Sequence, residues 1–266
     1  MIGARKIAFK GALIWLAAIV ILATCIRWLP LPDPLAVDLS VTAAHPNLMH
    51  LAGTDELGRD VLSLLLPASA ATLEIVAGAT VLSLLIALLL GTTAGFIGGW
   101  VDVAVRISVD LLWSVPFVVF VVLIVGVLGV SKITLVVTIG VLNWVGPARV
   151  LRGEVSRLRH ADFVVAARSR GYSWHTILFQ EVLPNLRGTI LTLAAYGAIE
   201  VLTLETGLAF VGLSLPAPAP TWGGMLADGL GYFSTAWWIV IGTSGMITAT
   251  LASLQIAARS IETRTQ

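Results

Sequence analysis

The stretch VVAARSRGYSWHTILFQEVLPNL, residues 164–186, decides the fold because it is basic and amphipathic in a chain that is otherwise mostly apolar. Long hydrophobic runs lie on both sides of it. Gly171, near its centre, can adopt the left-handed conformation that ends a helix and redirects the chain. We therefore expect a bent, polar connection between two apolar spans.

Two short helices are predicted around this glycine. The first covers residues 161–169 and the second residues 174–182, each with apolar positions at three-to-four spacing. Pro184 lacks an amide proton, so it favours a break or kink before the next span begins. The apolar face needs a partner, either the lipid headgroup layer or a groove on a soluble protein, and the physical chemistry alone leaves both open.

The composition indicates a membrane protein. Of 266 residues, 58% are hydrophobic and 12% are charged, whereas soluble domains have about a quarter charged. The net charge of +1 argues against nucleic acid as a partner. Cys25 is the single cysteine, which excludes an internal disulfide and a cysteine-based zinc cluster.

Six runs are long and apolar enough to be membrane spans, for which about 20 residues are needed. We predict an all-α membrane protein whose six transmembrane helices cover residues 7–29, 75–97, 111–130, 133–148, 189–215 and 233–258. The fourth run is short, so its helix is expected to continue past Arg149. Glu200 and Glu205 interrupt the fifth run, which leaves its limits the least certain.

The distribution of Lys and Arg predicts the orientation, because these residues concentrate in cytoplasmic loops. With the N-terminus inside, three of them lie outside: Arg27, Arg59 and Lys132. The other thirteen lie inside: Arg5, Lys6, Lys10, Arg106, Arg149, Arg152, Arg157, Arg159, Arg168, Arg170, Arg187, Arg259 and Arg264. Both termini are therefore expected to be cytoplasmic, with membrane lipid around the spans.

Two outer loops are prominent. Residues 30–70 contain a turn-like Gly-Thr-Asp followed by a candidate short amphipathic helix. Residues 212–232 contain LPAPAPTWGGM, whose Pro and Gly spacing predicts no regular helix. The tryptophans expected at outer span ends, as interfacial aromatics, are Trp28, Trp237 and Trp238.

Small and charged residues inside the spans have separate interpretations. Gly91 and Gly95 form a Gly-x-x-x-Gly that predicts close helix packing, with Ala87 one turn before them.

The carboxylates that must face protein or a water-filled path are Asp110, Glu200 and Glu205. Asp110 follows Arg106 by four residues, a spacing that allows an ion pair. Glu205 suits either the pathway lining or a hydrogen bond between helices.

Nucleotide, metal and catalytic motifs do not occur in the sequence. No lysine is preceded by glycine and followed by Ser or Thr, as a phosphate loop requires. There is no His-Glu-x-x-His, Gly-x-Ser-x-Gly or Cys-x-x-Cys. His45 and His50 lie five residues apart in a loop, poor geometry for a shared metal. We expect no active site, no metal site and no cofactor bound by this chain.

The spacing in the opening stretch resembles the "EAA" loop of ABC importer permeases. Ala166 and Ala167 are followed by Gly171, and Leu183-Pro184 begins twelve positions after the glycine. The stretch departs from the family pattern at Val165, where the family has Glu. The resemblance implies an ATPase-coupling loop, about residues 154–187. Its candidate coupling residues are Ala166, Ala167, Gly171, Trp174, Ile177, Leu178, Leu183 and Pro184.

Three further segments resemble the C-type permeases of dipeptide, oligopeptide and nickel importers, most closely the dipeptide permeases. They are GTDELGRDVLS (53–63), RISVDLLWSVP (106–116) and ETGLAFVGLSLPAPAPTWGGML (205–226). Leu64 and Ala70 replace arginines that are usual there, so the contacts of those arginines are lost or replaced.

The resemblance implies a type I ABC importer transmembrane domain. The expected divisions are residues 1–70, a first helix with an extracytoplasmic segment; residues 71–260, the transmembrane domain; and residues 261–266, a cytoplasmic tail.

The implied partners are a second permease, ATPase subunits that bind ATP and Mg, and an extracytoplasmic binding protein, all at a bacterial plasma membrane. The implied substrate is a di- or oligopeptide. The alternatives are nickel or another small solute, a transporter driven by an ion gradient, and a membrane scaffold or enzyme.

Overall fold

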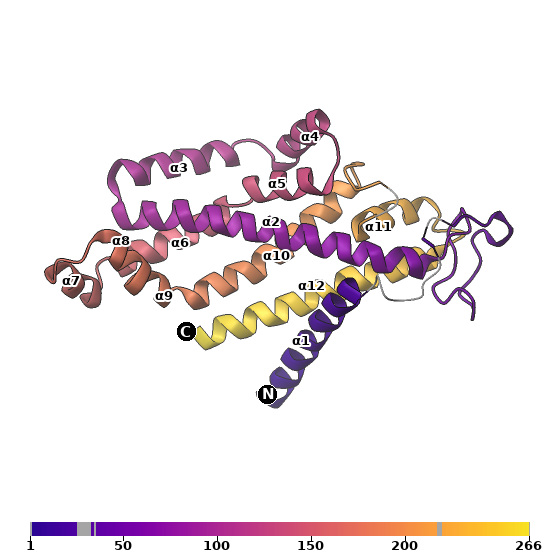
Figure 1. Ribbon diagram of the computed structural model, residues 1–266, viewed down its shortest axis with the longest axis horizontal. Helices are drawn as coiled ribbons and strands as arrows, with labels where there is room; N and C mark the ends of the chain where they lie inside the picture. Colours follow the sequence, from indigo (N-terminus) through magenta and orange to yellow (C-terminus); the bar gives the residue numbers. More distant parts are fainter. Residues whose placement is uncertain (1, 26–32, 35, 217–219, 266) are drawn as a thin grey trace.

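The computed structural model describes residues 2–25, 33–34, 36–216 and 220–265, and in them every regular element is a helix (Figure 1). An isolated bridge between Thr54 and Asp60 is the one β pairing among these residues. The helices are α1 (Ile2–Cys25), η2 (Leu39–Val41), α2 (Val61–Ile97), α3 (Gly99–Trp113), α4 (Phe117–Leu128), α5 (Lys132–Leu142), α6 (Val145–Leu158), α7 (Asp162–Ser169), α8 (Trp174–Ile177), η3 (Leu178–Val182), α9 (Leu183–Asn185), α10 (Arg187–Ala209), α11 (Trp222–Gly231) and α12 (Trp237–Thr265).

The described residues contain five helices that are long and apolar enough to cross a membrane, and a bent pair of helices that counts as a sixth span. The five are α1, α2, the continuous α5–α6 unit, α10 and α12. This agrees with the predicted all-helical architecture of six spans. The end of the predicted first span, residues 26–29 with Trp28, lies outside the described residues.

The second span begins fourteen residues earlier than predicted, at Val61. The carboxylate of Asp60 caps α2 by accepting a hydrogen bond from the Ser63 amide at 2.8 Å. Residues 61–70, where the sequence suggested a separate short helix in an outer loop, are the first turns of α2, and the expected division after residue 70 falls inside this helix. At 37 residues, α2 is about 55 Å long, whereas a bilayer core is about 30 Å thick.

The third span is not one straight helix from residue 111 to residue 130. Its helix ends at Trp113, a new one starts at Phe117, and the two meet at 81°. Pro116, at the N-terminus of α4, cannot donate the amide hydrogen bond that a continuous helix would need. The predicted third span thus corresponds to the second half of a bent pair, in which α3 lies alongside α2 and α4 turns away (Figure 1).

The boundaries of the last three spans also differ from the sequence prediction. The fourth span continues past Arg149 to Leu158, as expected. The fifth helix, α10, ends at Ala209 rather than at residue 215. The sixth, α12, runs to Thr265, so residues 261–265 extend a helix rather than form a separate tail.

A helix forms where the sequence predicted none. Thr221 caps α11 by accepting a hydrogen bond from the Gly224 amide at 3.1 Å, and the helix runs from Trp222 to Gly231 through the Gly-Gly pair. Both glycines are buried, and a methyl group on Gly223 would lie 2.8 Å from Thr206 Cα. A methyl group on Gly224 would overlap Ser214 Oγ. Close packing against α10 and against Ser214 therefore explains the two glycines, which the sequence alone suggested were helix breakers.

The Gly-x-x-x-Gly prediction is confirmed. A methyl group on Gly91 would lie 2.6 Å from the Ala148 carbonyl oxygen, and one on Gly95 would lie 2.5 Å from that of Arg152. The two glycines thus allow α2 and α6 to pack backbone against backbone, as small residues do in membranes. Ala87 is fully buried one turn earlier on the same helix.

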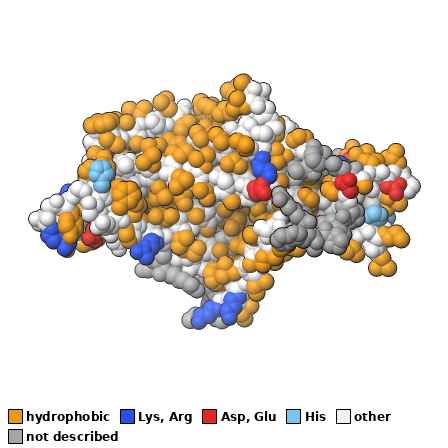
Figure 2. Space-filling model, viewed as in Figure 1, with side chains coloured by type: hydrophobic (Ala, Val, Ile, Leu, Met, Phe, Trp, Pro, Cys, Tyr) orange, Lys and Arg blue, Asp and Glu red, His pale blue; other side chains and the backbone are white. Residues whose placement is uncertain are grey.

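The molecule is elongated and its two ends differ (Figure 1). At one end, which we call the elbow end, lie α7–α9, and the C-terminal half of α12 runs toward it. At the other, the loop end, lie residues 36–60 and α11. The face seen in Figure 2 is largely hydrophobic between these ends, and most of its charged side chains lie at or near them. Apolar side chains form two buried clusters, one toward each end of α2.

Candidate functional site

The connection at the elbow end, residues 162–185, is called the elbow below, and it turns at Gly171. This glycine has a φ of +82°, as predicted for a residue that ends a helix. Its amide donates to the Arg168 carbonyl at 2.9 Å, and the Tyr172 amide donates to the Ala167 carbonyl at 3.2 Å. These two bonds form a Schellman motif, so α7 ends at a defined angle rather than by fraying. The Ser173 side chain then caps α8.

One face of the elbow is packed against its own subunit. Val164 and Ala167 of α7 are completely buried, and Ile177, Leu178 and Val182 belong to the same apolar cluster as α6 and the end of α2. Of the predicted coupling residues, Ala167, Ile177 and Leu178 are buried, Leu183 and Pro184 are half-buried, and Ala166, Gly171 and Trp174 are exposed. The predicted set therefore contains both anchors and outward-facing residues.

The opposite face of the elbow exposes large apolar side chains. Phe179 is 64% exposed, and Val165, Tyr172 and Trp174 are also exposed. The rings of Trp174 and His175 stack with centroids 3.4 Å apart. Trp174 is among the predicted coupling residues and the other three are not, because helical spacing does not show which positions the subunit itself covers. These four are the large apolar side chains that the elbow leaves exposed in this subunit.

The second helix of the elbow is irregular rather than straight. After one α-helical turn the chain forms a π-helix over Leu178–Val182, and α9 follows. Pro184 lies in the first turn of α9, where a missing amide proton is tolerated. The chain leaves helical geometry at Leu186, two residues after the predicted break at Pro184.

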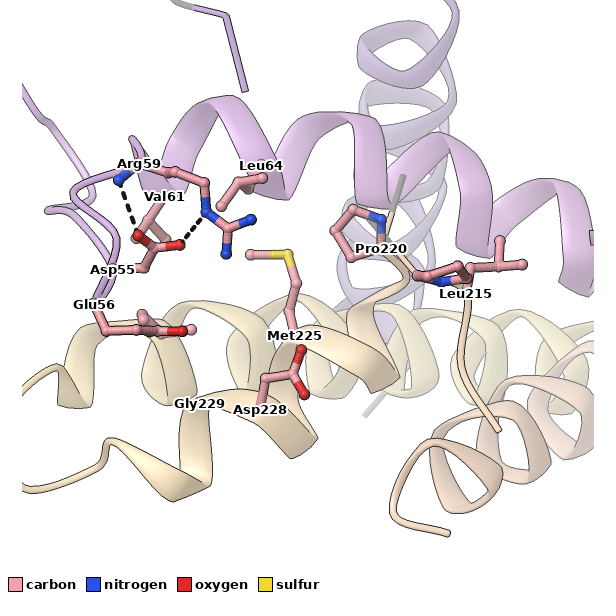
Figure 3. A pocket seen from close by; sticks show the side chains of 12 residues that line it. Asp55, Glu56, Arg59, Val61, Leu64, Leu215, Pro220, Met225, Asp228 and Gly229 are labelled. Carbon is pink, nitrogen blue, oxygen red and sulfur yellow. Dashed lines mark hydrogen bonds and ion pairs between the residues drawn. The ribbon is translucent and has the colours of Figure 1, made fainter. Parts of the chain in front are cut away.

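A cavity of about 120 Å³ at the loop end lies between the two predicted outer loops (Figure 3). Asp55 accepts a hydrogen bond from Arg59 Nε at 2.6 Å and two more from the Leu57 and Arg59 amides, each at 2.9 Å. The Arg59 guanidinium points into the cavity, and the carboxylate of Asp228 on α11 lies across from it. Glu56 completes the polar part of the lining.

Two tryptophans fix the loop end. Trp222, fully buried, donates from its indole Nε1 to Ser69 Oγ at 3.0 Å and from its amide to Thr72 Oγ1 at 2.9 Å. Trp238 donates from Nε1 to the Thr54 carbonyl at 3.1 Å and is 5% exposed. Trp238 is therefore part of the core, whereas the sequence had suggested an interfacial aromatic. Its hydrogen-bond partner lies 184 positions away in the sequence.

The histidines of the outer loop are part of its scaffold. His50 Nδ1 lies 2.9 Å from Asp60 Oδ2, which ties the loop to the start of α2. The His45 ring packs on Trp238 with centroids 4.8 Å apart. In the described part of the chain, no three His, Cys, Asp or Glu side chains are grouped so that they could hold a metal ion.

The three intramembrane carboxylates lie in different surroundings. Glu205 is 2% exposed, faces the start of α11, and has no hydrogen-bond partner among the described residues. Glu200 lines a cavity of about 280 Å³. Asp110 is exposed, and Arg106 pairs not with it but with Asp102, at 3.3 Å. The predicted ion pair between Arg106 and Asp110 is therefore replaced by one between Arg106 and Asp102.

The cavity that contains Glu200 lies at the bend between α3 and α4. Trp113, Pro116 and Phe117 from the bend line it, together with Asn143 of the α5–α6 junction. Non-helical backbone at membrane depth is tolerated where it is buried in protein or lines a water-filled cavity. The bend thus lines a mostly apolar cavity in which Glu200 and Asn143 are the polar side chains.

A larger cavity, about 750 Å³, lies toward the elbow end between α6, α10 and α12. Its lining includes Glu154, Arg157, Thr189, Thr192 and Glu262. This polar lining contrasts with the apolar surfaces of the same helices.

The sequence was compared with those of known proteins. Residues 87–266 match the family described as "Binding-protein-dependent transport system inner membrane component". The oligopeptide transport system permease protein of Bacillus subtilis (strain 168) is 29% identical over 252 residues, which cover 95% of this chain and 82% of that protein. The nickel transport system permease protein of Escherichia coli (strain K12) is 32% identical over 224 residues, with coverage of 84% and 81%. The dipeptide transport system permease protein of Bacillus subtilis (strain 168) is 28% identical over 218 residues, with coverage of 82% and 68%.

The family match covers more than half of the chain, and it includes the elbow, the bend and α10–α12. The predicted resemblance to importer permeases, the inner-membrane location and the role as a transport subunit rather than an enzyme are confirmed by it. The chain belongs to the binding-protein-dependent transport system inner membrane components and is a multi-pass permease subunit of an ABC importer.

Proposed function

We propose that this subunit forms one half of a pathway for di- or oligopeptides, and that a second, similar permease forms the other half. Separate cytoplasmic subunits bind ATP and Mg and drive the motion. An extracytoplasmic binding protein delivers the substrate. Both termini and the elbow lie on the cytoplasmic side, an orientation that the thirteen-to-three distribution of basic residues supports.

The elbow is the observation that carries this proposal. Its buried anchors, such as Ala167 and Ile177, pack in one apolar cluster with α6 and the end of α2, so a force on the elbow can be passed to these two helices. Its exposed face, with Trp174 and Phe179, fits the helix-in-groove mode of recognition. We assign this face to a groove on the ATPase subunit. The alternative, docking on lipid headgroups, would leave ATP hydrolysis without a mechanical connection to the spans.

The loop-end cavity supports docking of the binding protein at the opposite end. Residues 36–60 and α11, which are far apart in sequence, meet around it (Figure 3). The hydrogen bonds of Trp222 and Trp238 hold these segments to α2 and to residue 54. A partner that binds across both segments can therefore pass its motion directly to α2 and α12.

Glu200 is the residue we place in the pathway. Its carboxylate stands in a cavity with Trp113 and Phe117, a pairing of one anionic group with apolar surface. A peptide has an ammonium terminus and, in most sequences, apolar side chains, so its chemistry matches this lining. Glu205 is buried against α11 and is assigned to helix packing instead.

Nickel or another small solute is the second candidate for the substrate, because a nickel permease is about as similar in sequence as the peptide permeases. Uptake into vesicles that contain the complete transporter and its binding protein distinguishes a peptide importer from a nickel importer. Uptake of a radiolabelled dipeptide that requires ATP supports the proposal. Uptake of labelled nickel but not of peptides supports the alternative, and uptake driven by an ion gradient without any ATPase contradicts both.

A further inference from the structure

A further charged cavity lies between α3 and α6, distinct from the loop-end cavity, the Glu200 cavity and the cavity between α6, α10 and α12. It measures about 200 Å³, and Val105 and Val109 form its apolar wall. Its polar lining consists of Arg106, Asp110, Arg149 and Arg152. We call it the arginine pocket.

The arginine pocket retains positive charge after its internal pairing is counted. Asp102 bridges two of its arginines, with Arg152 Nη1 at 2.6 Å and Arg106 Nε at 3.3 Å. Each guanidinium has five N–H donors, so a single contact leaves most of them available. With three arginines facing Asp102 and Asp110, the group has a net charge of +1.

Arg149 is held in place without a carboxylate. Its guanidinium carbon lies 4.0 Å from the ring centroid of Trp113, a cation–π contact. No described residue forms an ion pair with Arg149, so its N–H groups remain available to an anion. Trp113 is itself 58% exposed.

The pocket opens beside an apolar surface. Ile107 and Leu111 are exposed on α3, and Val150 is exposed on α6. Arginine and tryptophan next to exposed aliphatic side chains are typical of the level at which headgroups meet acyl chains. In the orientation proposed above, this level belongs to the inner leaflet, because all three arginines are in the predicted inner set.

We propose that the arginine pocket binds the phosphodiester of an anionic phospholipid of the inner leaflet, with its acyl chains against Ile107, Leu111 and Trp113. Basic pockets between transmembrane helices on the cytoplasmic side bind anionic headgroups in this way. A hydroxyl on the headgroup, as in phosphatidylglycerol, can donate a hydrogen bond to Asp110. The inference rests on the proposed orientation but not on the identity of the substrate.

A lipid is favoured over free phosphate because the exposed apolar surface continues from the pocket. Inorganic phosphate would use the arginines and leave Ile107 and Leu111 unpartnered. The Asp110 carboxylate would also repel inorganic phosphate, which has no acyl chain whose burial could offset this repulsion. Both ligands would present a phosphate group to the arginines, and a binding experiment distinguishes a phospholipid from free phosphate.

The direct test is native mass spectrometry of the purified transporter, titrated with phosphatidylglycerol or with phosphatidylcholine. We expect the wild type to bind phosphatidylglycerol more tightly. Near a membrane surface, loss of one arginine weakens such binding about fivefold, so the variant Arg106→Gln/Arg149→Gln should bind about 25-fold more weakly. Arg157→Gln/Arg159→Gln removes the same charge from nearby positions that do not line the pocket, and it should bind within about twofold of the wild type.

Equal binding of the two lipids, or equal loss in both double variants, would overturn the proposal. So would saturation of the pocket by inorganic phosphate at the same affinity, which would make the site one for a free anion. If the first double variant does not assemble, the wild type is tested with a photoreactive phosphatidylglycerol. Adducts on peptides from α3 and α6 support the proposal, whereas their absence, or a cross-link that shows the second permease covering the pocket, contradicts it.

Discussion

The indole Nε1 of Trp222 donates a hydrogen bond to Ser69 Oγ at 3.0 Å, although the two residues are 153 positions apart in the sequence. Ser69 Oγ in turn donates to the Leu65 carbonyl at 2.8 Å, so both groups are satisfied in a fully buried site. The amide of Trp222 donates to Thr72 one turn farther along α2. The start of α11 is thus fixed to the N-terminal part of α2 by two hydrogen bonds.

Trp222→Phe should lower the stability of the subunit by at least about 1–3 kcal/mol, because the buried hydrogen bond to Ser69 is lost and the smaller phenyl ring leaves a cavity. The measurement is thermal unfolding of the detergent-purified transporter. Trp100→Phe is the matched control, since Trp100 is 80% exposed, and it should change stability by less than about 0.5 kcal/mol. Equal effects of the two substitutions would show that the contact between α11 and α2 does not stabilise the fold.

Gly171→Val should uncouple ATP hydrolysis from substrate while the subunit still inserts and assembles. A φ of +82° costs an ordinary L-residue about 1–2 kcal/mol, and a β-branched residue more, so the population of the correctly turned elbow falls by roughly 5- to 30-fold. The space around this position is open, so strain rather than a clash is the cause. Substrate-stimulated ATPase activity in nanodiscs is the measurement.

Gly171→Asn is the matched variant, because asparagine tolerates the left-handed conformation. It should retain most of the stimulation. A loss as large as that of Gly171→Val would mean that the side chain itself, rather than the backbone turn, disturbs coupling.

Glu200→Gln should reduce ATP-dependent uptake of peptides with a free amino terminus by roughly 10- to 150-fold, because a charge-assisted hydrogen bond contributes about 1.5–3 kcal/mol. N-acetylated peptides should be taken up slowly by the wild type and be insensitive to the substitution. Glu205→Gln is the control, since Glu205 is buried against α11 and does not line this cavity. Uptake that falls equally for both substitutions would argue against a pathway role specific to Glu200.

Glu56→Lys and Asp228→Lys should each weaken stimulation by the binding protein, because both reverse a charge at the loop-end cavity (Figure 3). Charges at the rim of an interface act mainly on the association rate, so the effect should shrink as salt is raised. The measurement is the binding-protein concentration for half-maximal ATPase stimulation at low and high salt. No shift in either variant would place the docking surface elsewhere.

Local patterns in the sequence predicted the spans, the elbow turn at Gly171 and the packing of Gly91, because each depends on residues close together in the chain. The α11 helix was missed, since Gly223 and Gly224 are explained by close contacts with Thr206 and Ser214, which lie outside this helix. The bend at Pro116 was missed as well, because hydropathy is continuous across it although the backbone is not.

Specific contacts between residues in the fold could not be predicted from the sequence either. The Trp238 bond to the Thr54 carbonyl spans 184 positions, and nothing local distinguishes this tryptophan from an interfacial one. The pairing of Arg106 with Asp102 rather than Asp110 is a further case, because both carboxylates are four residues away on one helix. Arg152, from α6, bonds to Asp102 and shows which side of α3 carries the network.

Site-specific cross-linking from position 179 tests the central claim most directly. Phe179→Cys in a Cys25→Ser background leaves one reactive thiol on the exposed face of the elbow. The account predicts that a membrane-impermeant maleimide labels this thiol only from the cytoplasmic side, and that a bifunctional cross-linker joins it to the ATPase subunit. Labelling from the outside, or cross-links to lipid alone throughout the ATP cycle, would contradict the account.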